Sequence, residues 1–253
     1  MGMEFAGEID ALGAGVDGFA VGDRVFGMSP ERFGAHAEYI CLSADGPLAH
    51  VSERLDLSKM VVCEGAWYAN GTTQILSPGQ NALIFGASGA IGTAATQLAK
   101  IAGTRVTAVV QSRHFELASS LGADRVIDCE VEDFTAHEEK FDLVFDAVGK
   151  TSYFACRGLL RPGGVFSATD LGPAWSNIAL STWSSLTGSG RVRIPFPDDA
   201  SGFVRTFRAL LEDGRFHGVF DRTFAFEDIV EAYRYVEIGQ KTGIVVVEMP
   251  KWS

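Results

Sequence analysis

Residues 81–113 constrain the fold of this chain more than any other stretch. Residues 81–85 form an apolar run that predicts a buried strand, and a turn of small residues, Gly86-Ala-Ser-Gly89-Ala-Ile-Gly92, follows it. Residues 93–102 carry apolar side chains at helical spacing, and residues 106–110 predict a second buried strand. This order predicts a βαβ unit whose glycines lie where the helix begins.

The glycine turn is the first candidate binding site. The amides at a helix N-terminus have no partner within the helix, and glycines leave no side chain to block them, so a pyrophosphate can bind there. The residues expected to contact it are Gly86, Ala87, Ser88, Gly89, Ala90, Ile91 and Gly92. The alternative is a tight turn that binds nothing. We favour a dinucleotide site because the glycines follow a strand and open a helix.

Beyond this unit, apolar runs alternate with helical segments. Strands are expected at residues 126–128, 141–146, 165–168 and 192–195, and helices at 115–121 and 151–160, with Gly122 as a C-cap. The segment at 171–193 reads as irregular. This alternation predicts an α/β fold with a doubly wound parallel sheet.

The two ends of the chain have a different pattern. Strand-like pieces at 5–12, 24–26 and 34–42, separated by glycines, indicate a small barrel or sandwich that begins in mid-strand. Residues 57–73 then have a helical pattern. In the tail, helices are expected at 201–213 and 227–238, and strands at 219–224 and 244–248.

Composition narrows the class of partner and the compartment. The 253 residues carry a formal net charge of −11, which argues against nucleic acid or an anionic membrane as the partner. No apolar run is long enough to span a bilayer, and the N-terminus lacks the pattern of a secretory signal. The four cysteines lie far apart, with no CxxC spacing. They predict reduced thiols in the cytoplasm.

The end of the second strand indicates which dinucleotide binds. NAD-specific sites carry an acid about 20 residues beyond the glycines, which binds the ribose 2′-hydroxyl. Here the strand ends in Gln111-Ser112-Arg113. Ser112 offers a hydroxyl and Arg113 a planar donor fork, which suit a 2′-phosphate, so NADPH is favoured over NADH. The alternative is that Arg113 is a solvated residue at the start of the next helix.

Two more strand ends are expected at the same edge of the sheet. Parallel sheets of this kind bind ligands at the carboxyl ends of their strands. The candidates to approach a nicotinamide ring are Ala147, Val148, Gly149, Thr169, Asp170 and Leu171. Ordinary turns at both places remain the alternative.

Other chemistries find less support in the sequence. The turn at Gly86 lacks the last glycine of a nucleophile elbow, and Tyr153 is followed by Arg157 where a Tyr-x-x-x-Lys motif needs lysine. A methyltransferase would need an acid after the second strand. The histidines form no spaced cluster, so no metal site is expected.

Motifs along nearly the whole chain resemble the medium-chain dehydrogenase/reductase superfamily. The zinc-independent branch, similar to zeta-crystallin and quinone oxidoreductases, fits best. The matching segments are Gly7-Glu-Ile-Asp-Ala-Leu-Gly13, Val21-Gly-Asp-Arg-Val-Phe26, Gly34-Ala-His-Ala-Glu-Tyr39, Pro78-Gly-Gln80, Leu121-Gly-Ala-Asp124, Phe141-Asp-Leu-Val-Phe-Asp-Ala-Val-Gly149, Leu160-Arg-Pro-Gly-Gly164 and Lys241-Thr-Gly243.

The resemblance implies two domains and a reaction. Residues 1–62 and 218–253 would form a partial GroES-like β-barrel, and residues 63–217 a Rossmann dinucleotide-binding domain. NADPH would donate hydride to a quinone or an α,β-unsaturated carbonyl. The glycine turn, with Ala87 at the first fingerprint position, would hold the cofactor, Ser112 and Arg113 would meet its 2′-phosphate, and Lys241 joins the cofactor-binding candidates.

The sequence departs from the family pattern in three places. Zinc-dependent members carry Gly-His-Glu where this chain has Gly2-Met3-Glu4, and no four-cysteine lobe follows, so zinc chemistry is not expected. Family members carry several dozen residues before this point. Where relatives often have a threonine near the nicotinamide, this chain has Trp67-Tyr68, and Tyr68 is the candidate proton donor. A packing role for Tyr68 is the alternative.

These departures leave a second function open, and the resemblance suggests an assembly. A truncated, weakly catalytic protein could bind NADPH as a sensor or a structural ligand. Relatives pair their dinucleotide domains near the sixth strand. We therefore expect a homodimer that uses the segment at 171–193, with Trp175 and Trp183.

Overall fold

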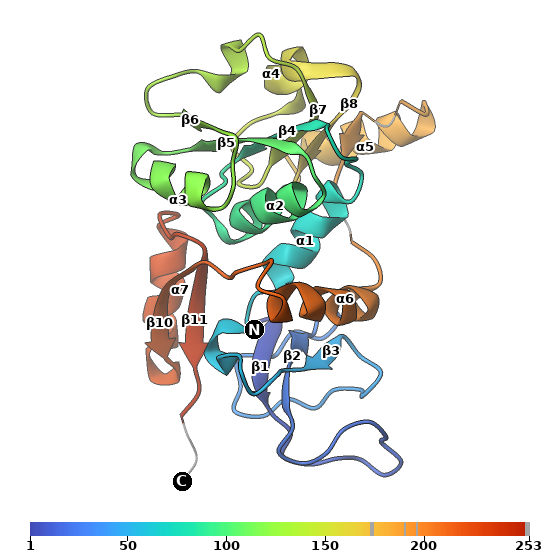
Figure 1. The fold of residues 1–253 in the computed structure, drawn as a ribbon, viewed down its shortest axis with the longest axis vertical. Helices are drawn as coiled ribbons and strands as arrows, with labels where there is room; N and C mark the ends of the chain where they lie inside the picture. Colours follow the sequence, from blue (N-terminus) through green and yellow to red (C-terminus); the bar gives the residue numbers. More distant parts are fainter. Residues whose placement is uncertain (173–174, 190, 196, 251–253) are drawn as a thin grey trace. The chain divides into compact units, whose positions relative to one another are not determined.

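The computed structural model describes residues 1–172, 175–189, 191–195 and 197–250, which form two compact units (Figure 1). The first unit comprises Met1–Trp67 and Asp198–Ser253, and the second comprises Tyr68–Pro197. The sequence places the boundaries after residues 62 and 217, whereas the units divide after residues 67 and 197. Helix α6 (Ala200–Glu212) is therefore part of the first unit. No helix in the described ranges has the length and apolar character needed to cross a membrane.

The second unit is built on a six-stranded sheet. Its strand order is β6-β5-β4-β7-β8-β9, and all neighbouring strands are parallel. The strands are β4 (Asn81–Phe85), β5 (Arg105–Val110), β6 (Arg125–Asp128), β7 (Phe141–Asp146), β8 (Leu160–Ala168) and β9 (Val192–Arg193). The order reverses between β4 and β7. The predicted doubly wound Rossmann sheet is confirmed.

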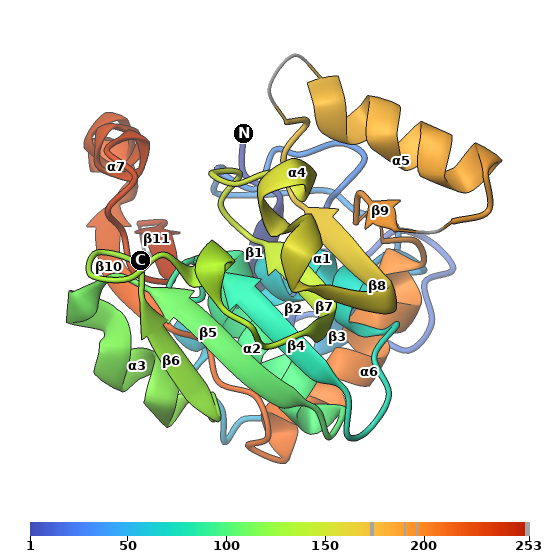
Figure 2. The same cartoon turned by 90° about the horizontal axis from the view of Figure 1, so that it is seen from above.

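Helices cover both faces of this sheet. Helices α2 (Ala90–Ile101) and α3 (Phe115–Ser120) lie on one face, and α4 (Tyr153–Cys156) lies on the other (Figure 2). Helix α1 (Cys63–Thr73) enters from the first unit, and the Thr72 hydroxyl lies 3.1 Å from that of Ser167 in β8. Because both faces are covered, the strands are apolar in nearly continuous runs rather than alternating.

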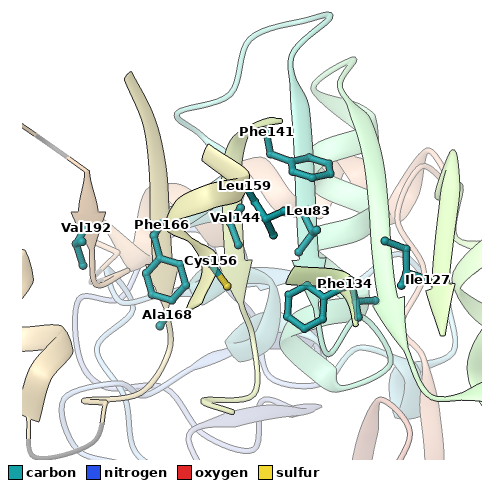
Figure 3. Packing of buried hydrophobic residues seen from close by; sticks show 11 residues of the cluster. Leu83, Ile127, Phe134, Phe141, Val144, Cys156, Leu159, Phe166, Ala168 and Val192 are labelled. Atoms are coloured by element: carbon teal, nitrogen blue, oxygen red, sulfur yellow. The ribbon is translucent and has the colours of Figure 1, made fainter. Parts of the chain in front are cut away.

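One hydrophobic cluster of the second unit packs against α4 and the 3₁₀ turn η4 (Arg157–Leu159). Phe141, Val144 and Phe166 from the central strands are fully buried there against Cys156 and Leu159 (Figure 3). Phe85 and Phe134 stack beside this cluster, with ring centroids 4.9 Å apart. The core thereby supports the carboxyl ends of the strands, where the predicted site lies.

The first unit contains two small sheets. Strands β1 (Glu4–Glu8), β2 (Arg24–Met28) and β3 (Leu48–His50) form an antiparallel sheet, and α6 contacts β3. Strands β10 (Phe220–Ala225) and β11 (Ile244–Glu248) form a parallel pair, joined by α7 (Ile229–Glu237). Both sheets lie in the unit formed by the two ends of the chain, where a partial GroES-like domain is expected from the sequence.

The predicted strand at 34–42 is wrong. Phe33 and Gly34 have positive φ angles of 57° and 92°, which end the extended course of the backbone. The Ala35 and His36 amides then donate to the carbonyls of Gly2 and Met1, but no ladder continues from them. The third strand is β3 instead, in a segment without a clear alternating pattern.

Three helical segments also differ from their predictions. Residues 57–73 divide into a 3₁₀ turn, η1 (Leu57–Lys59), and α1. The helix expected at 151–160 shortens to α4 and a 3₁₀ turn, η4 (Arg157–Leu159), because β8 already begins at Leu160. The segment expected to be irregular contains α5 (Ser176–Leu186), whose many serines and threonines conceal its helical pattern.

Candidate cofactor site

The four predicted loop segments of the second unit meet at the carboxyl edge of the sheet. Each follows a different strand, and backbone hydrogen bonds join neighbouring strand ends. These bonds run from Gly86 N to Val109 O (3.0 Å), Ala147 N to Phe85 O (3.0 Å) and Thr169 N to Asp146 O (3.1 Å). The segments at 86–92 and 147–149 flank the point where the strand order reverses, which is where sheets of this class bind ligands.

The glycines of the turn have distinct structural roles. Gly86 has φ +78°, and a Cβ there would lie 1.7 Å from Val148 Cγ2. A Cβ at Gly92 would lie 2.1 Å from the Gly86 carbonyl oxygen. Both positions therefore require glycine for the turn itself, because any side chain would displace the loop after β7 or the start of α2.

Gly89 is different because folding does not require it. It is the N-cap of α2, has no side chain to cap the helix, and a Cβ would meet only the Gly86 carbonyl oxygen, at 3.7 Å. The first amides of α2 have no acceptor within the helix. This open helix N-terminus fits a pyrophosphate in charge and in space, so the residues present suit a dinucleotide.

Ser112 and Arg113 lie directly after β5, in the 3₁₀ turn η2 (Ser112–His114). The Arg113 guanidinium donates from Nε to His114 Nε2 at 3.0 Å and from Nη2 to Gln111 Oε1 at 3.1 Å. The Ser112 hydroxyl donates to Asp128 Oδ2 at 2.5 Å, and its amide donates to Glu130 Oε2 at 3.0 Å.

Asp128 and Glu130 are not among the residues predicted from the sequence. Asp128 is the last residue of β6 and Glu130 lies two residues beyond it, outside the segment after β5 where NAD-specific sites carry an acid. They reach Ser112 because β5 and β6 are parallel neighbours whose carboxyl ends coincide. No local sequence signal marks the two acids, because it is the pairing of these two strands that brings them to Ser112.

Asp146 is a third residue that is not predicted from the sequence. It is the last residue of β7 and is fully buried. Its Oδ1 accepts the amides of Val148 (3.0 Å) and Gly149 (2.8 Å), and its Oδ2 accepts that of Thr151 (2.8 Å). Burial raises the pKa of this carboxyl. Asp146 thereby positions the predicted 147–149 segment.

Asp170 positions the loop after β8. Its Oδ2 accepts the Gly172 amide at 3.0 Å, and its Oδ1 accepts the Asn177 side-chain amide at 2.9 Å. Gly149, with φ +74°, lies close to it, since a Cβ there would approach Asp170 Cβ to 2.8 Å. The 147–149 and 169–171 segments are therefore in direct contact, as the convergence of strand ends predicts.

Lys241 belongs to the first unit, among partly buried carboxylates. Its Nζ donates to the Gly243 carbonyl at 2.6 Å, and the charges of Glu4 and Glu64 act on it. The Glu4 carboxylate accepts the Glu64 amide at 3.0 Å, at the start of α1, and desolvation raises the pKa of Glu4 to about 7. Burial lowers the pKa of Lys241 and raises that of Glu64. A cofactor contact by Lys241 stays a prediction.

Tyr68 lies half-buried within α1, and its role as proton donor stays a prediction. Across the described part of the chain, no three His, Cys, Asp or Glu side chains cluster so that they could hold a metal ion. Met3, where zinc-dependent members have histidine, is buried and offers only a thioether.

Comparison with known proteins places the chain in a family. Residues 121–247 match the family described as "Zinc-binding dehydrogenase", and residues 1–53 match the "Alcohol dehydrogenase GroES-like domain". The chain is 30% identical over 273 residues to trans-enoyl reductase pgmF of Aspergillus terreus. The alignment covers 98% of this chain and 76% of that protein.

Two further relatives agree with this placement. The chain is 27% identical to the chloroplastic quinone-oxidoreductase QR1 of Triphysaria versicolor, over 97% of this chain and 78% of that protein. Its fold matches the quinone oxidoreductase from Coxiella burnetii with a TM-score of 0.84 at 24% identity, covering 99% of this chain and 79% of that one. The chain therefore belongs to the medium-chain dehydrogenase/reductase superfamily.

Proposed function

We propose that this chain is an NADPH-dependent reductase that transfers hydride, without zinc, to a quinone or an α,β-unsaturated carbonyl. The observation that carries the proposal is the open N-terminus of α2 at the reversal point of a parallel sheet, with Ser112 and Arg113 at the neighbouring strand end. Relatives named as a trans-enoyl reductase and a quinone-oxidoreductase support the reaction class.

In this proposal the cofactor supplies the hydride, and the residues of the chain bind and orient it. The amides of residues 90–92 hold the pyrophosphate, while Arg113 meets the 2′-phosphate. The segments 147–149 and 169–171, positioned by Asp146 and Asp170, border the nicotinamide by backbone and apolar contacts. Tyr68 is the proposed proton donor to the carbonyl oxygen.

The proposal extends to assembly and compartment. All four cysteines are free thiols, which suits the reducing cytoplasm. The apolar side chains exposed around α5 are proposed to form a homodimer contact. The acceptor is a small molecule, and the net charge of −11 disfavours a nucleic acid partner.

The function is tested by following NADPH oxidation with a panel of quinones and enones. We expect turnover of at least one acceptor class, and nicotinamide binding by fluorescence titration. Absence of binding for both NADPH and NADH would refute the proposal. Binding without turnover of any acceptor would refute the reductase and favour a sensor.

The cofactor preference is tested at Arg113. Replacing Arg113 with Ala should weaken NADPH binding by about tenfold or more and leave NADH within about twofold, because only NADPH carries the 2′-phosphate that the guanidinium meets. Equal losses for both nucleotides would contradict the assignment.

A further inference from the structure

Both hydrogen-bond donors of Ser112 point at carboxylates. The hydroxyl donates to Asp128 Oδ2 at 2.5 Å and the amide to Glu130 Oε2 at 3.0 Å. The two acids are themselves linked, since the Glu130 amide donates to Asp128 Oδ1 at 2.9 Å. The groups proposed to receive a 2′-phosphate are therefore already engaged by two negative charges.

The guanidinium of Arg113 hydrogen-bonds to side chains on either side of it in the chain. It contacts Gln111 Oε1 and His114 Nε2, and Gln111 in turn donates from Nε2 to Glu130 Oε1 at 3.3 Å. Asp128 and Glu130 therefore place two carboxylates in hydrogen-bond contact with Ser112. A carboxylate accepts a hydrogen bond from a ribose hydroxyl but repels a phosphate dianion.

A cavity next to these residues connects Asp128 and Glu130 with the proposed nucleotide site. It has a volume of about 500 Å³ and is lined by Phe85, Phe134 and residues 129–133. The stacked rings of Phe85 and Phe134 supply an apolar wall. Because Glu130 both lines this cavity and accepts the Ser112 amide, it connects the cavity to the position proposed for the 2′-substituent.

We propose that Asp128 and Glu130 are specificity-determining residues that oppose the 2′-phosphate and admit the free ribose diol. This inference rests on the proposed NADPH site and refines it. Arg113 favours NADPH, the two acids disfavour it, and the chain accepts both nucleotides, with NADH bound within about tenfold of NADPH.

The test uses the full chain and compares four probes by fluorescence or calorimetric titration: NADPH, NADH, 2′,5′-ADP and 5′-AMP. The variants are Asp128→Asn and Glu130→Gln, which keep the side-chain shape and one acceptor oxygen while removing the charge. Each single variant should tighten the binding of NADPH and 2′,5′-ADP, and the double variant should tighten it by about tenfold. The affinities for NADH and 5′-AMP should stay within about threefold of those of the unmodified chain. Glu138→Gln is the control. Glu138 is an exposed acid in the segment that follows β6, and its replacement removes the same charge.

The outcomes separate this inference from the proposed function. The role of the acids would be overturned if the ratio of NADPH to NADH affinity is unchanged in both variants. If Arg113→Ala then still weakens NADPH binding more than NADH binding, the proposed NADPH site is retained. An equal gain in NADPH affinity in the Glu138→Gln control would show that the effect comes from the net charge of the chain, and would also overturn the role of the two acids. Absence of binding of either nucleotide by the unmodified chain would overturn both proposals. The two single variants provide independent tests if one of them fails to fold.

Discussion

Individual glycines in the turn at 86–92 separate the requirements of folding from those of binding. Gly92 is buried and has no room for a Cβ, whereas Gly89 has an extended backbone, with φ −80° and ψ 173°, and open space beside it. The same small change, glycine to alanine, therefore has different consequences three residues apart.

We expect Gly92→Ala to lower the free energy of unfolding by about 2 kcal/mol or more, since the new Cβ forces Gly86 and α2 apart. Gly89→Ala should change it by less than about 0.5 kcal/mol and yet weaken NADPH binding by about tenfold, because the Cβ stands where the pyrophosphate approaches. Urea unfolding and fluorescence titration measure the two effects. Normal nucleotide affinity in Gly89→Ala would contradict the position of the phosphates.

The carboxyl of Glu4 makes stability depend on pH. Its pKa rises from 4.5 to about 7 in the folded chain, mainly through desolvation. The folded state therefore keeps the Glu4 proton to a higher pH than the unfolded state does. The stabilisation that this protonation gives to the folded state is fully present below pH 4.5 and is lost as the pH rises through 7.

Glu4→Gln keeps an acceptor for the Glu64 amide and removes the titration. We expect the unmodified chain to lose about 1 to 3 kcal/mol of this group's contribution between pH 4.5 and 7, and Glu4→Gln to lose correspondingly less. Urea unfolding at several pH values gives the comparison. Parallel pH profiles for the two proteins would show that Glu4 is not the titrating group.

At the scale of elements, the loop after β7 depends on one side chain. Three backbone amides, of Val148, Gly149 and Thr151, donate to the carboxylate of Asp146. The loop has no other regular structure, and the segment proposed to border the nicotinamide lies within it.

Asp146→Asn replaces one acceptor oxygen by a donor and leaves at least one of these part-buried amides without its carboxylate acceptor. We expect a loss of about 1 to 3 kcal/mol in unfolding free energy, and faster hydrogen exchange at the amides of residues 148, 149 and 151. If exchange accelerates across the whole sheet but not in this loop, the loss is global and the positioning role is wrong.

At the scale of the whole molecule, α5 carries an exposed apolar surface next to the edge strand β9. Trp175, Trp183 and Leu186 are 66%, 67% and 79% exposed. An apolar patch beside a sheet edge is a typical association surface. This arrangement supports the proposed homodimer.

Light scattering should show a dimer, and Trp183→Glu should convert it to a monomer, because a charge in a buried apolar contact is not compensated. Ile238→Glu is the control, since Ile238 is also exposed (63%) but lies in the other unit. A monomer of the unmodified chain at high concentration would refute the proposal.

Local sequence patterns predict much of the second unit. Apolar runs, their branched residues and the intervening helical spacing predict strands β4 to β9 in order, because these signals depend on near neighbours. The same signals fail at 34–42 and in α5. At 34–42, hydrogen bonds to the distant residues Met1 and Gly2 outweigh the local alternating pattern. In α5, a serine-rich surface hides the helical spacing.

The glycine turn, its place before a helix and the candidates Ser112 and Arg113 follow from the sequence by itself, because each depends on residues adjacent in the chain. Only the tertiary structure brings Asp128 and Glu130 to Ser112, and Lys241 near Glu4. In the first case the parallel pairing of β5 with β6 aligns their ends, and in the second the two chain ends fold into one unit. The balance of charge around the proposed 2′-phosphate is therefore a property of strand pairing and cannot be read from one segment alone.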